Sequence, residues 1–154
     1  MKRIILSLNE MSFELPKGWS LTKDKYNLSN GQGFLNKENY LSESGKVISF
    51  FEVHRDPDEF FDSYQKLLDD YSHVTDSFTL EKQFSFKFND FEFPAYVIKG
   101  VNDTIIRTLQ VFVNCGDCLG CFMVMVEHYS NDLRDMIRDD EGVKAVAKIL
   151  RTIE

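Results

Sequence analysis

The chain has 154 residues, of which 43% are hydrophobic, and its formal net charge is −7. A chain of this size buries roughly 70% of its unfolded surface on folding, so it needs neither a disulfide nor a metal ion to hold a core. We therefore expect a single domain over residues 1–154. The acidic balance argues against a general nucleic-acid binder, which has a basic surface, and against an anionic membrane as partner.

The N-terminal residues resemble a secretion signal over only a short stretch. The apolar stretch that begins at Ile4 is interrupted by Asn9 and Glu10, so it falls below the roughly 7–15 residues that the apolar part of a signal needs. No run of the sequence approaches the ~20 apolar residues of a membrane span. The three cysteines are an odd number, which agrees with a reducing compartment. We expect a cytoplasmic protein that does not insert directly into a membrane.

The first third of the chain predicts strands separated by turns. Residues 12–15 alternate between polar and apolar types, and Pro16-Lys17-Gly18 ends them with a turn. A short strand is expected near residues 33–40, with a turn at 42–45, and a stronger strand covers residues 47–55. Its alternation puts Phe51 and Val53 on one face and Ile48, Phe50 and Glu52 on the other.

A capping pattern predicts a helix over residues 57–72. Asp56 is suited to accept hydrogen bonds from the free N–H groups of the first turn, Pro57 fits the first helical position, and Glu59 completes a capping box. The apolar residues that follow have helical spacing and form one stripe, so we expect the helix to pack on the sheet. The stripe consists of Phe60, Phe61, Tyr64, Leu67, Leu68 and Tyr71.

Phenylalanines dominate the next segment, since residues 78–93 hold six of the fourteen in the chain. Phe84, Phe86 and Phe88 alternate with polar residues, and in a strand they share one face. A second strand follows the turn at Asn89-Asp90. We expect the three rings to pack under the helix at 57–72, where they meet Phe60, Tyr64 and Leu68.

The rest of the chain predicts another hairpin and two helices. Strands over residues 104–114 and 118–128 flank a turn at Gly116-Asp117, a helix starts within 132–138, and a last helix covers 142–153. Its inward residues are Val143, Val146, Ile149, Leu150 and Ile153. Strands joined by short turns pair antiparallel. We therefore predict an α+β fold, with an antiparallel, twisted β-sheet of about six strands and helices packed on one face.

Three closely spaced cysteines form the motif that most suggests a metal site. Cys115, Cys118 and Cys121 have C-x2-C-x2-C spacing, which allows thiolates to wrap an iron–sulfur cluster or a zinc ion. The sequence holds no fourth cysteine, and His128 is the nearest other ligand. The alternative is a hairpin whose small residues happen to be cysteines, with Cys121 packed as a small hydrophobe. We favour that alternative and expect no metal.

No other pattern predicts catalysis or a cofactor. His54, His73 and His128 are scattered, and none has a serine or cysteine at a recognisable spacing. The carboxylates on the polar face of the helix at 57–72 are explained by capping and solubility. Gly31-Gln32-Gly33 lacks the third glycine and the strand–helix context of a phosphate loop. We expect a protein that is not an enzyme.

The last hairpin is apolar on both faces, which is more than a sheet covered on one side requires. One explanation is that both faces are buried, within the monomer or in a dimer. The other is an open groove for an apolar partner, where methionines adapt to varied helices. The residues of this predicted groove are Phe50, Ile106, Thr108, Phe112, Met123 and Met125.

Short motifs along the chain carry a resemblance to a known family. Phe13-Glu14-Leu15-Pro16-x-Gly18-Trp19 resembles the opening strand and turn of the DcrB-like proteins, which have the PsbP-like fold. Within that group the effector-associated (Eag) chaperones of type VI secretion are similar in order and length. The matching motifs are Phe51-x-Val53-x-Arg55-Asp56, Phe61-Asp62-Ser63-Tyr64 and Gln110-Val111-Phe112-Val113. Glu52, Thr108 and Gln110 make this chain's groove more polar than the family's.

The resemblance implies a small, acidic, cytosolic homodimer that cradles the hydrophobic or amphipathic N-terminal helices of a secreted effector. Our leading expectation is therefore a non-enzymatic chaperone or adaptor with an apolar groove for a helix. Two alternatives stay open. One is a metal or redox protein built on Cys115, Cys118 and Cys121. The other is an immunity protein that neutralises a toxin with its acidic surface.

Overall fold

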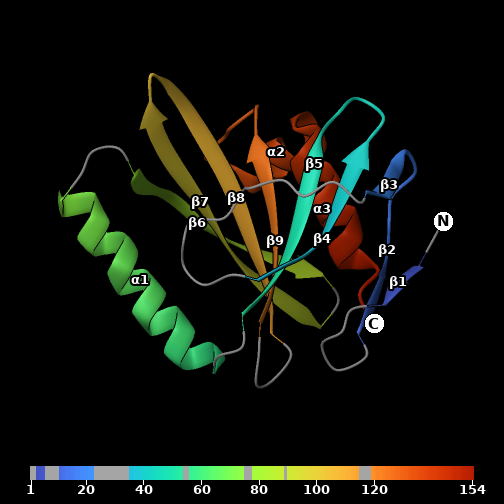
Figure 1. Cartoon of the computed structure of the whole chain (residues 1–154), viewed down its shortest axis with the longest axis horizontal. Helices are drawn as coiled ribbons and strands as arrows, with labels where there is room; N and C mark the ends of the chain where they lie inside the picture. The colour runs from blue at the N-terminus through green and yellow to red at the C-terminus, as the bar shows by residue number, and fades with distance from the viewer. Residues whose placement is uncertain are drawn as a thin grey trace.

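The computed structural model describes residues 3–5, 11–22, 35–53, 56–74, 78–88, 90–114 and 119–154. The predicted order of strands, one helix, four strands and closing helices is confirmed (Figure 1). The elements are β1 (Arg3–Ile5), β2 (Ser12–Glu14), β3 (Trp19–Thr22), β4 (Leu35–Ser42), β5 (Val47–Val53), α1 (Pro57–Val74), β6 (Phe78–Phe88), β7 (Phe91–Asn102), β8 (Thr104–Asn114), β9 (Leu119–Val126), α2 (Leu133–Asp139) and α3 (Glu141–Arg151).

The predicted α+β fold with an antiparallel sheet is confirmed. In the described part of the chain, β1 and β2 form a small separate pair, and seven strands form the main sheet in the order β3-β4-β5-β9-β8-β7-β6. All neighbours in this sheet pair antiparallel. The strand beyond the expected six is β3, which begins at Trp19 directly after the predicted turn. β5 and β9 are far apart in sequence but pair at the centre of the sheet.

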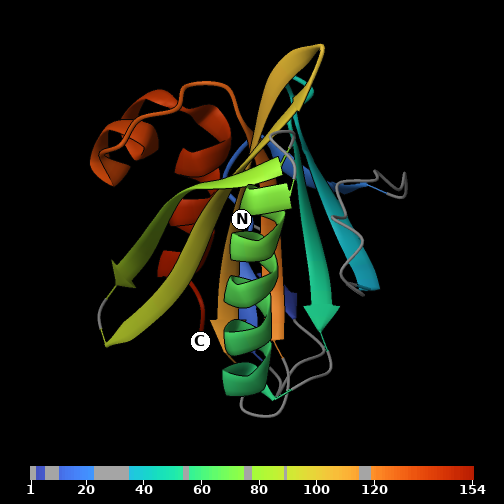
Figure 2. The same ribbon diagram turned by 90° about the vertical axis from the view of Figure 1, so that its left-hand side faces the viewer.

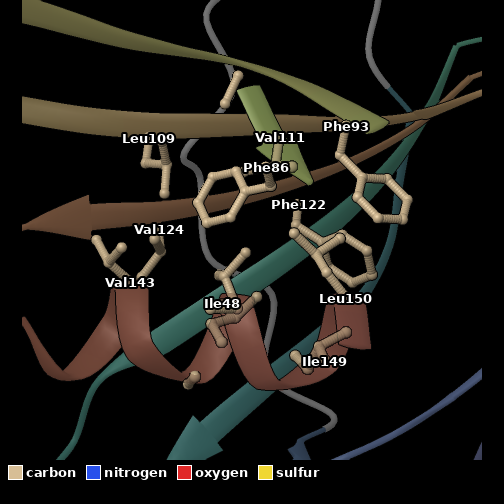
Figure 3. Close-up of a cluster of buried hydrophobic side chains, with 14 of the residues drawn as sticks. Ile48, Phe86, Phe93, Leu109, Val111, Phe122, Val124, Val143, Ile149 and Leu150 are labelled. Atoms are coloured by element: carbon tan, nitrogen blue, oxygen red, sulfur yellow. The ribbon is translucent and has the colours of Figure 1, made fainter. Parts of the chain in front are cut away.

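Helices cover both faces of the sheet, rather than the one face that we expected. α1 lies on one side of the strands, and α2 and α3 lie on the other (Figures 1 and 2). The face toward α3 carries a core in which Val143, Ile149 and Leu150 meet the sheet (Figure 3). The face toward α1 carries a second core that includes Phe60 and Tyr64. We call these two surfaces the α3 face and the α1 face. The apolar residues on both sides of β8 and β9 require this arrangement.

The prediction that Phe84, Phe86 and Phe88 pack under α1 is wrong. Phe86 is buried in the core of the α3 face, and Phe84 and Phe88 pack against that same core. A β-bulge between Leu80 and Lys82 explains the difference, because it inserts one extra residue into β6. Leu80 lies before the bulge and packs on the α1 face, whereas Phe84 lies after it and packs on the α3 face. In a regular strand these two residues would share a face.

The helix starts follow the predicted capping chemistry. The Asp56 carboxylate accepts a hydrogen bond from the Glu59 N–H at 3.1 Å, so Asp56 is the N-cap of α1 as expected. Asp132 caps α2, where its side chain accepts from the Arg134 and Asp135 N–H groups. The expected inward residues of the last helix are buried, namely Val143, Val146, Ile149, Leu150 and Ile153.

Asp140 ties the end of β9 to the start of α3. Its carboxylate is fully buried and accepts from the N–H groups of Glu127 at 2.7 Å, His128 at 2.9 Å and Val143 at 3.0 Å. Beside it, Gly142 lies so close to β9 that an added Cβ would come within 2.5 Å of a Val124 methyl group. One carboxylate and one missing side chain therefore fix the approach of α3 to the sheet.

Replacing Asp140 should cost much more stability than replacing an ordinary helix cap. Asp140→Ala leaves three N–H groups without their acceptor, so we expect the free energy of unfolding to fall by about 3 kcal/mol or more. Asp132→Ala removes a solvent-exposed cap and should cost about 1 kcal/mol. Urea unfolding of both variants measures the difference, and equal losses would contradict the role of Asp140.

Candidate binding surface

The structure brings five of the six predicted groove residues onto one face of the sheet. On β8 and β9, Phe112 and Met123 belong to the core of the α1 face, and the strand alternation puts Ile106, Thr108 and Met125 on the same side. Cross-strand pairing joins Thr108 directly to Met125. The grouping on these two strands therefore follows the alternation that the sequence shows.

Phe50 does not belong to this group, and its assignment to the groove is a misplacement. It lies on the α3 face, where it pairs with Phe122 across β5 and β9, and the two ring centroids are 5.0 Å apart. The physical reason is the alternation of β5, which turns Phe51 and Val53 toward α1 and Phe50 away from it. Phe50 is buried core on the far side of the sheet from Met123.

The centre of the α1 face is covered by α1 itself. Phe112 and Met123 are both 0% exposed. The ring of Phe112 lies 5.4 Å from that of Phe60 and 5.3 Å from that of Phe61, and Tyr64 stacks on Phe60 at 5.1 Å. These aromatic contacts stabilise the helix on the sheet. The chain's own helices therefore cover most of the apolar residues on the two faces of the sheet. Only part of the predicted groove is accessible.

Two pairs of buried polar residues on this face are joined by hydrogen bonds. The buried Gln110 accepts a hydrogen bond from the Tyr64 hydroxyl, which ties α1 to β8. The Ser49 hydroxyl donates to the Asn39 side chain at 2.7 Å, and both residues are buried. Burying a polar group is inexpensive only when it is hydrogen-bonded. Neither pair was expected from the sequence, because the pattern of apolar residues does not say which polar residues meet.

The accessible part of the face lies toward the β7–β8 turn. Ile106 is 44% exposed and Met125 is 41% exposed. The partly buried Thr108 lies two residues from Ile106 on β8 and directly opposite Met125 on β9. Ile106 pairs with Gly100 on β7, which has no side chain to shield it. The ring contacts between α1 and Phe112 that the structure describes come from Phe60, Phe61 and Tyr64, and the tip of the β7–β8 hairpin rises above α1 (Figure 2). We call Ile106, Thr108 and Met125 the open end of the α1 face.

Two more exposed apolar residues lie next to the same turn, on the opposite face of the β7–β8 hairpin. Val101 and Ile105 pair across β7 and β8 and are 41% and 56% exposed. Neither residue is among the predicted groove residues. Their exposure could have been predicted from their position next to the turn at Asn102-Asp103-Thr104, because strand ends at a turn extend beyond the packed layers.

The structure gives Cys121 no access to a metal ion or an oxidant. Its side chain is 0% exposed within the core of the α1 face, and burial raises the pKa of its thiol well above the ordinary value. A metal ligand or nucleophile needs the thiolate, so Cys121 is a small core residue. Cys115, Cys118 and His54 lie outside the described residues, as does the side chain of His73. His128 is exposed in the segment after β9.

Among the residues that the structure describes, no three His, Cys, Asp or Glu side chains gather as metal ligands.

A pocket of about 330 Å³ lies near the Asn114 end of β8, at the opposite end of that strand from Ile106. Its lining residues are Phe61, Gln83, Phe84, Ser85, Glu92, Pro94 and Asn114. Its one carboxylate, Glu92, accepts a hydrogen bond from the Ser85 hydroxyl at 2.7 Å. This lining offers no pair of groups for general acid–base chemistry.

Comparison with known proteins identifies the fold. No protein-family model matches the chain, and no curated protein matches its sequence. The chain is similar to the solution structure of cyanobacterial PsbP (CyanoP) from Synechocystis sp. PCC 6803, with a TM-score of 0.56, 13% identity and coverage of 99% of this chain and 91% of that one. A crystal structure from Bacteroides thetaiotaomicron VPI-5482 is also similar, with a TM-score of 0.54 and 13% identity.

These similarities establish a PsbP-like fold, which is the fold that the resemblance of the sequence implied. The match to the Bacteroides protein covers 99% of this chain but only 47% of that protein, so the chain spans about half its length. Within the described residues no helix is both long and apolar enough to cross a membrane.

The Cys121 thiol should be unreactive toward thiol reagents in the native protein. In a Cys115→Ser/Cys118→Ser variant it is the remaining thiol, and its burial and raised pKa should keep it from reacting with a disulfide reagent such as 5,5′-dithiobis(2-nitrobenzoate). We expect the reaction to be fast only after unfolding in guanidinium chloride. Rapid, stoichiometric reaction of the folded variant would show that this thiol is accessible and would reopen the redox interpretation.

The Tyr64–Gln110 hydrogen bond should couple α1 to the sheet. Tyr64→Phe and Gln110→Met each remove one side of this buried hydrogen bond, whereas the double variant removes both. We expect the double variant to lose less stability than the sum of the single variants, with a coupling energy of about 1–2 kcal/mol. Chemical denaturation of the four proteins measures this coupling. Strict additivity would mean that the hydrogen bond contributes nothing to the docking of α1.

Proposed function

We propose that the chain is a non-enzymatic chaperone or adaptor that binds the apolar side of an amphipathic helix from a protein partner. The observation that carries the proposal is the open end of the α1 face. Ile106 and Met125 are large apolar side chains on adjacent strands, and they are exposed at the margin of an otherwise closed core. Exposed apolar residues that gather at one place, rather than singly, are typical of protein interaction sites.

The residues of the open end suit the apolar side of a helix. Thr108 lies two residues from Ile106 on β8 and opposite Met125 on β9, and the β7 partner of Ile106 is Gly100, which has no side chain. Side chains at positions i, i+3 and i+4 of an amphipathic helix form one apolar stripe that can cover two neighbouring apolar residues. Met125 has an unbranched, adaptable side chain, which suits partners of varied sequence. Apolar burial supplies the driving force, at roughly 1.5–3 kcal/mol for each large side chain.

The sequence resemblance makes the proposal more specific. The DcrB-like proteins have the fold that this chain has, and the type VI effector-associated (Eag) chaperones are similar in motif order. We therefore propose that the partner helix belongs to the N-terminal region of a secreted effector, and that the chain works in the cytoplasm as a homodimer. Because α1 covers Phe112 and Met123, the contact is confined to the open end unless α1 moves.

Binding of an amphipathic peptide tests the proposal directly. A fluorescein-labelled, leucine- and alanine-rich helical peptide of about 20 residues should bind the protein and raise the fluorescence anisotropy. Ile106→Gln and Met125→Gln should each weaken this binding about tenfold or more, because each loses the burial of one large apolar side chain. Both residues are exposed, so these variants should keep the melting temperature of the parent protein.

Leu21→Gln is the matched control, because Leu21 is 45% exposed but lies on β3, away from β8 and β9. It should bind the peptide like the parent. Equal weakening by Leu21→Gln, or full binding by Ile106→Gln, would refute the assignment. Affinity that falls steeply with salt would instead indicate binding through the acidic surface, as in the immunity-protein alternative.

A further inference from the structure

A basic pocket lies where β2, the turn after it and the last turn of α3 meet. Its volume is about 360 Å³, within the roughly 300–1,000 Å³ of small-molecule sites. The lining residues are Glu14, Pro16, Lys17, Lys148, Arg151 and Thr152. This pocket is separate from the open end of the α1 face, because α3 and β2 pack on the other side of the sheet.

Hydrogen bonds hold the walls of the pocket in place. The Thr152 hydroxyl oxygen accepts from the Glu14 N–H at 2.8 Å and donates to the Ile149 carbonyl at 2.8 Å, so it joins β2 to the end of α3. The turn between β2 and β3 closes through the Trp19 N–H, which donates to the Pro16 carbonyl at 3.1 Å. Gly18 provides the positive φ of 89° that this turn requires. A site on such fixed elements is preorganised for a ligand.

Positive charge gathers in this pocket against the trend of the whole chain. Lys17, Lys148 and Arg151 line it together with a single carboxylate, Glu14, whereas the chain has a net charge of −7. Considering the described residues alone, none of these three cations forms an ion pair within 4.0 Å. Lys148 and Arg151 also favour the negative end of α3, but that effect does not account for Lys17, which comes from a different segment.

Arg151 is oriented by an aromatic ring. Its guanidinium carbon lies 4.8 Å from the centroid of the Phe88 ring, a cation–π contact that fixes the side chain at the rim. The N–H groups at the edge of a guanidinium stacked in this way remain available for two parallel hydrogen bonds to a carboxylate or phosphate. Pro16 and the methylene stems of the two lysines supply apolar wall.

We propose that this pocket binds a small organic molecule with one oxyanion group, a carboxylate or a phosphate, attached to an apolar body. The oxyanion lies between Arg151, Lys148 and Lys17, and the apolar body lies against Pro16. This inference does not depend on the proposed function, since it involves neither β8 nor β9.

Phenyl phosphate and benzoate are suitable probes, one for each oxyanion. Titration followed by ¹H–¹⁵N NMR should give saturable binding of at least one of them, with a dissociation constant on the order of 1 mM. The largest shifts should occur at the amides of Lys17, Gly18 and Thr152, around the pocket. Lys148→Glu and Arg151→Glu should each weaken binding by about tenfold or more.

Arg134→Glu is the matched control, because it makes the same change in net charge at an exposed position on α2. Binding to this variant should match the parent. Absence of saturation with both probes, shifts centred away from the pocket, or equal weakening by Arg134→Glu would each overturn the proposal. If Arg151→Glu disturbs folding through loss of the Phe88 contact, Lys148→Glu and the shift map of the parent protein still decide the matter.

Discussion

The structure depends on one constraint, which is that β8 and β9 are apolar on both sides. Leu109, Val111 and Phe122 face α3, while Phe112, Cys121 and Met123 face α1. A strand of this kind is stable only when both faces are shielded from water. The chain meets the requirement with α1 on one side and α3 on the other, and the two aspartate caps at Asp56 and Asp140 place the starts of those helices. The sandwich of helix, sheet and helix follows from that one pattern.

Local patterns in the sequence predicted the elements well but not the side of the sheet on which they pack. The bounds of β8, the capping of α1 and the inward residues of α3 are all local properties. The face occupied by Phe84, Phe86 and Phe88 is not local, because it depends on a single extra residue between Leu80 and Lys82. Alternation states which residues share a face, and a bulge reverses that relation without any change in composition.

The candidate surface was predictable to the same extent. Alternation correctly grouped Ile106 with Met125, since both lie on strands without an irregularity between them. It could not show that α1 covers Phe112 and Met123, because that depends on how the first turns of α1 dock through Phe60, Phe61 and Tyr64. The basic pocket could not be predicted from the sequence for a similar reason. Lys17 and Arg151 are near opposite ends of the sequence, and only the packing of α3 against β2 brings them together.

The strand order has a consequence for how the protein folds. β9 is the last of the described strands along the chain, yet it lies between β5 and β8 in the middle of the sheet. Until β9 is inserted, the strands before α1 and those after it form two blocks, each with an inner edge that exposes unpaired backbone groups. Pairings between distant segments, such as Phe50 with Phe122, raise the contact order and slow folding. On the ribosome, β5 emerges well before residues 119–126, so its inner edge stays unpaired while α1 and β6 to β8 are made, whereas β8 is followed almost directly by its partner β9.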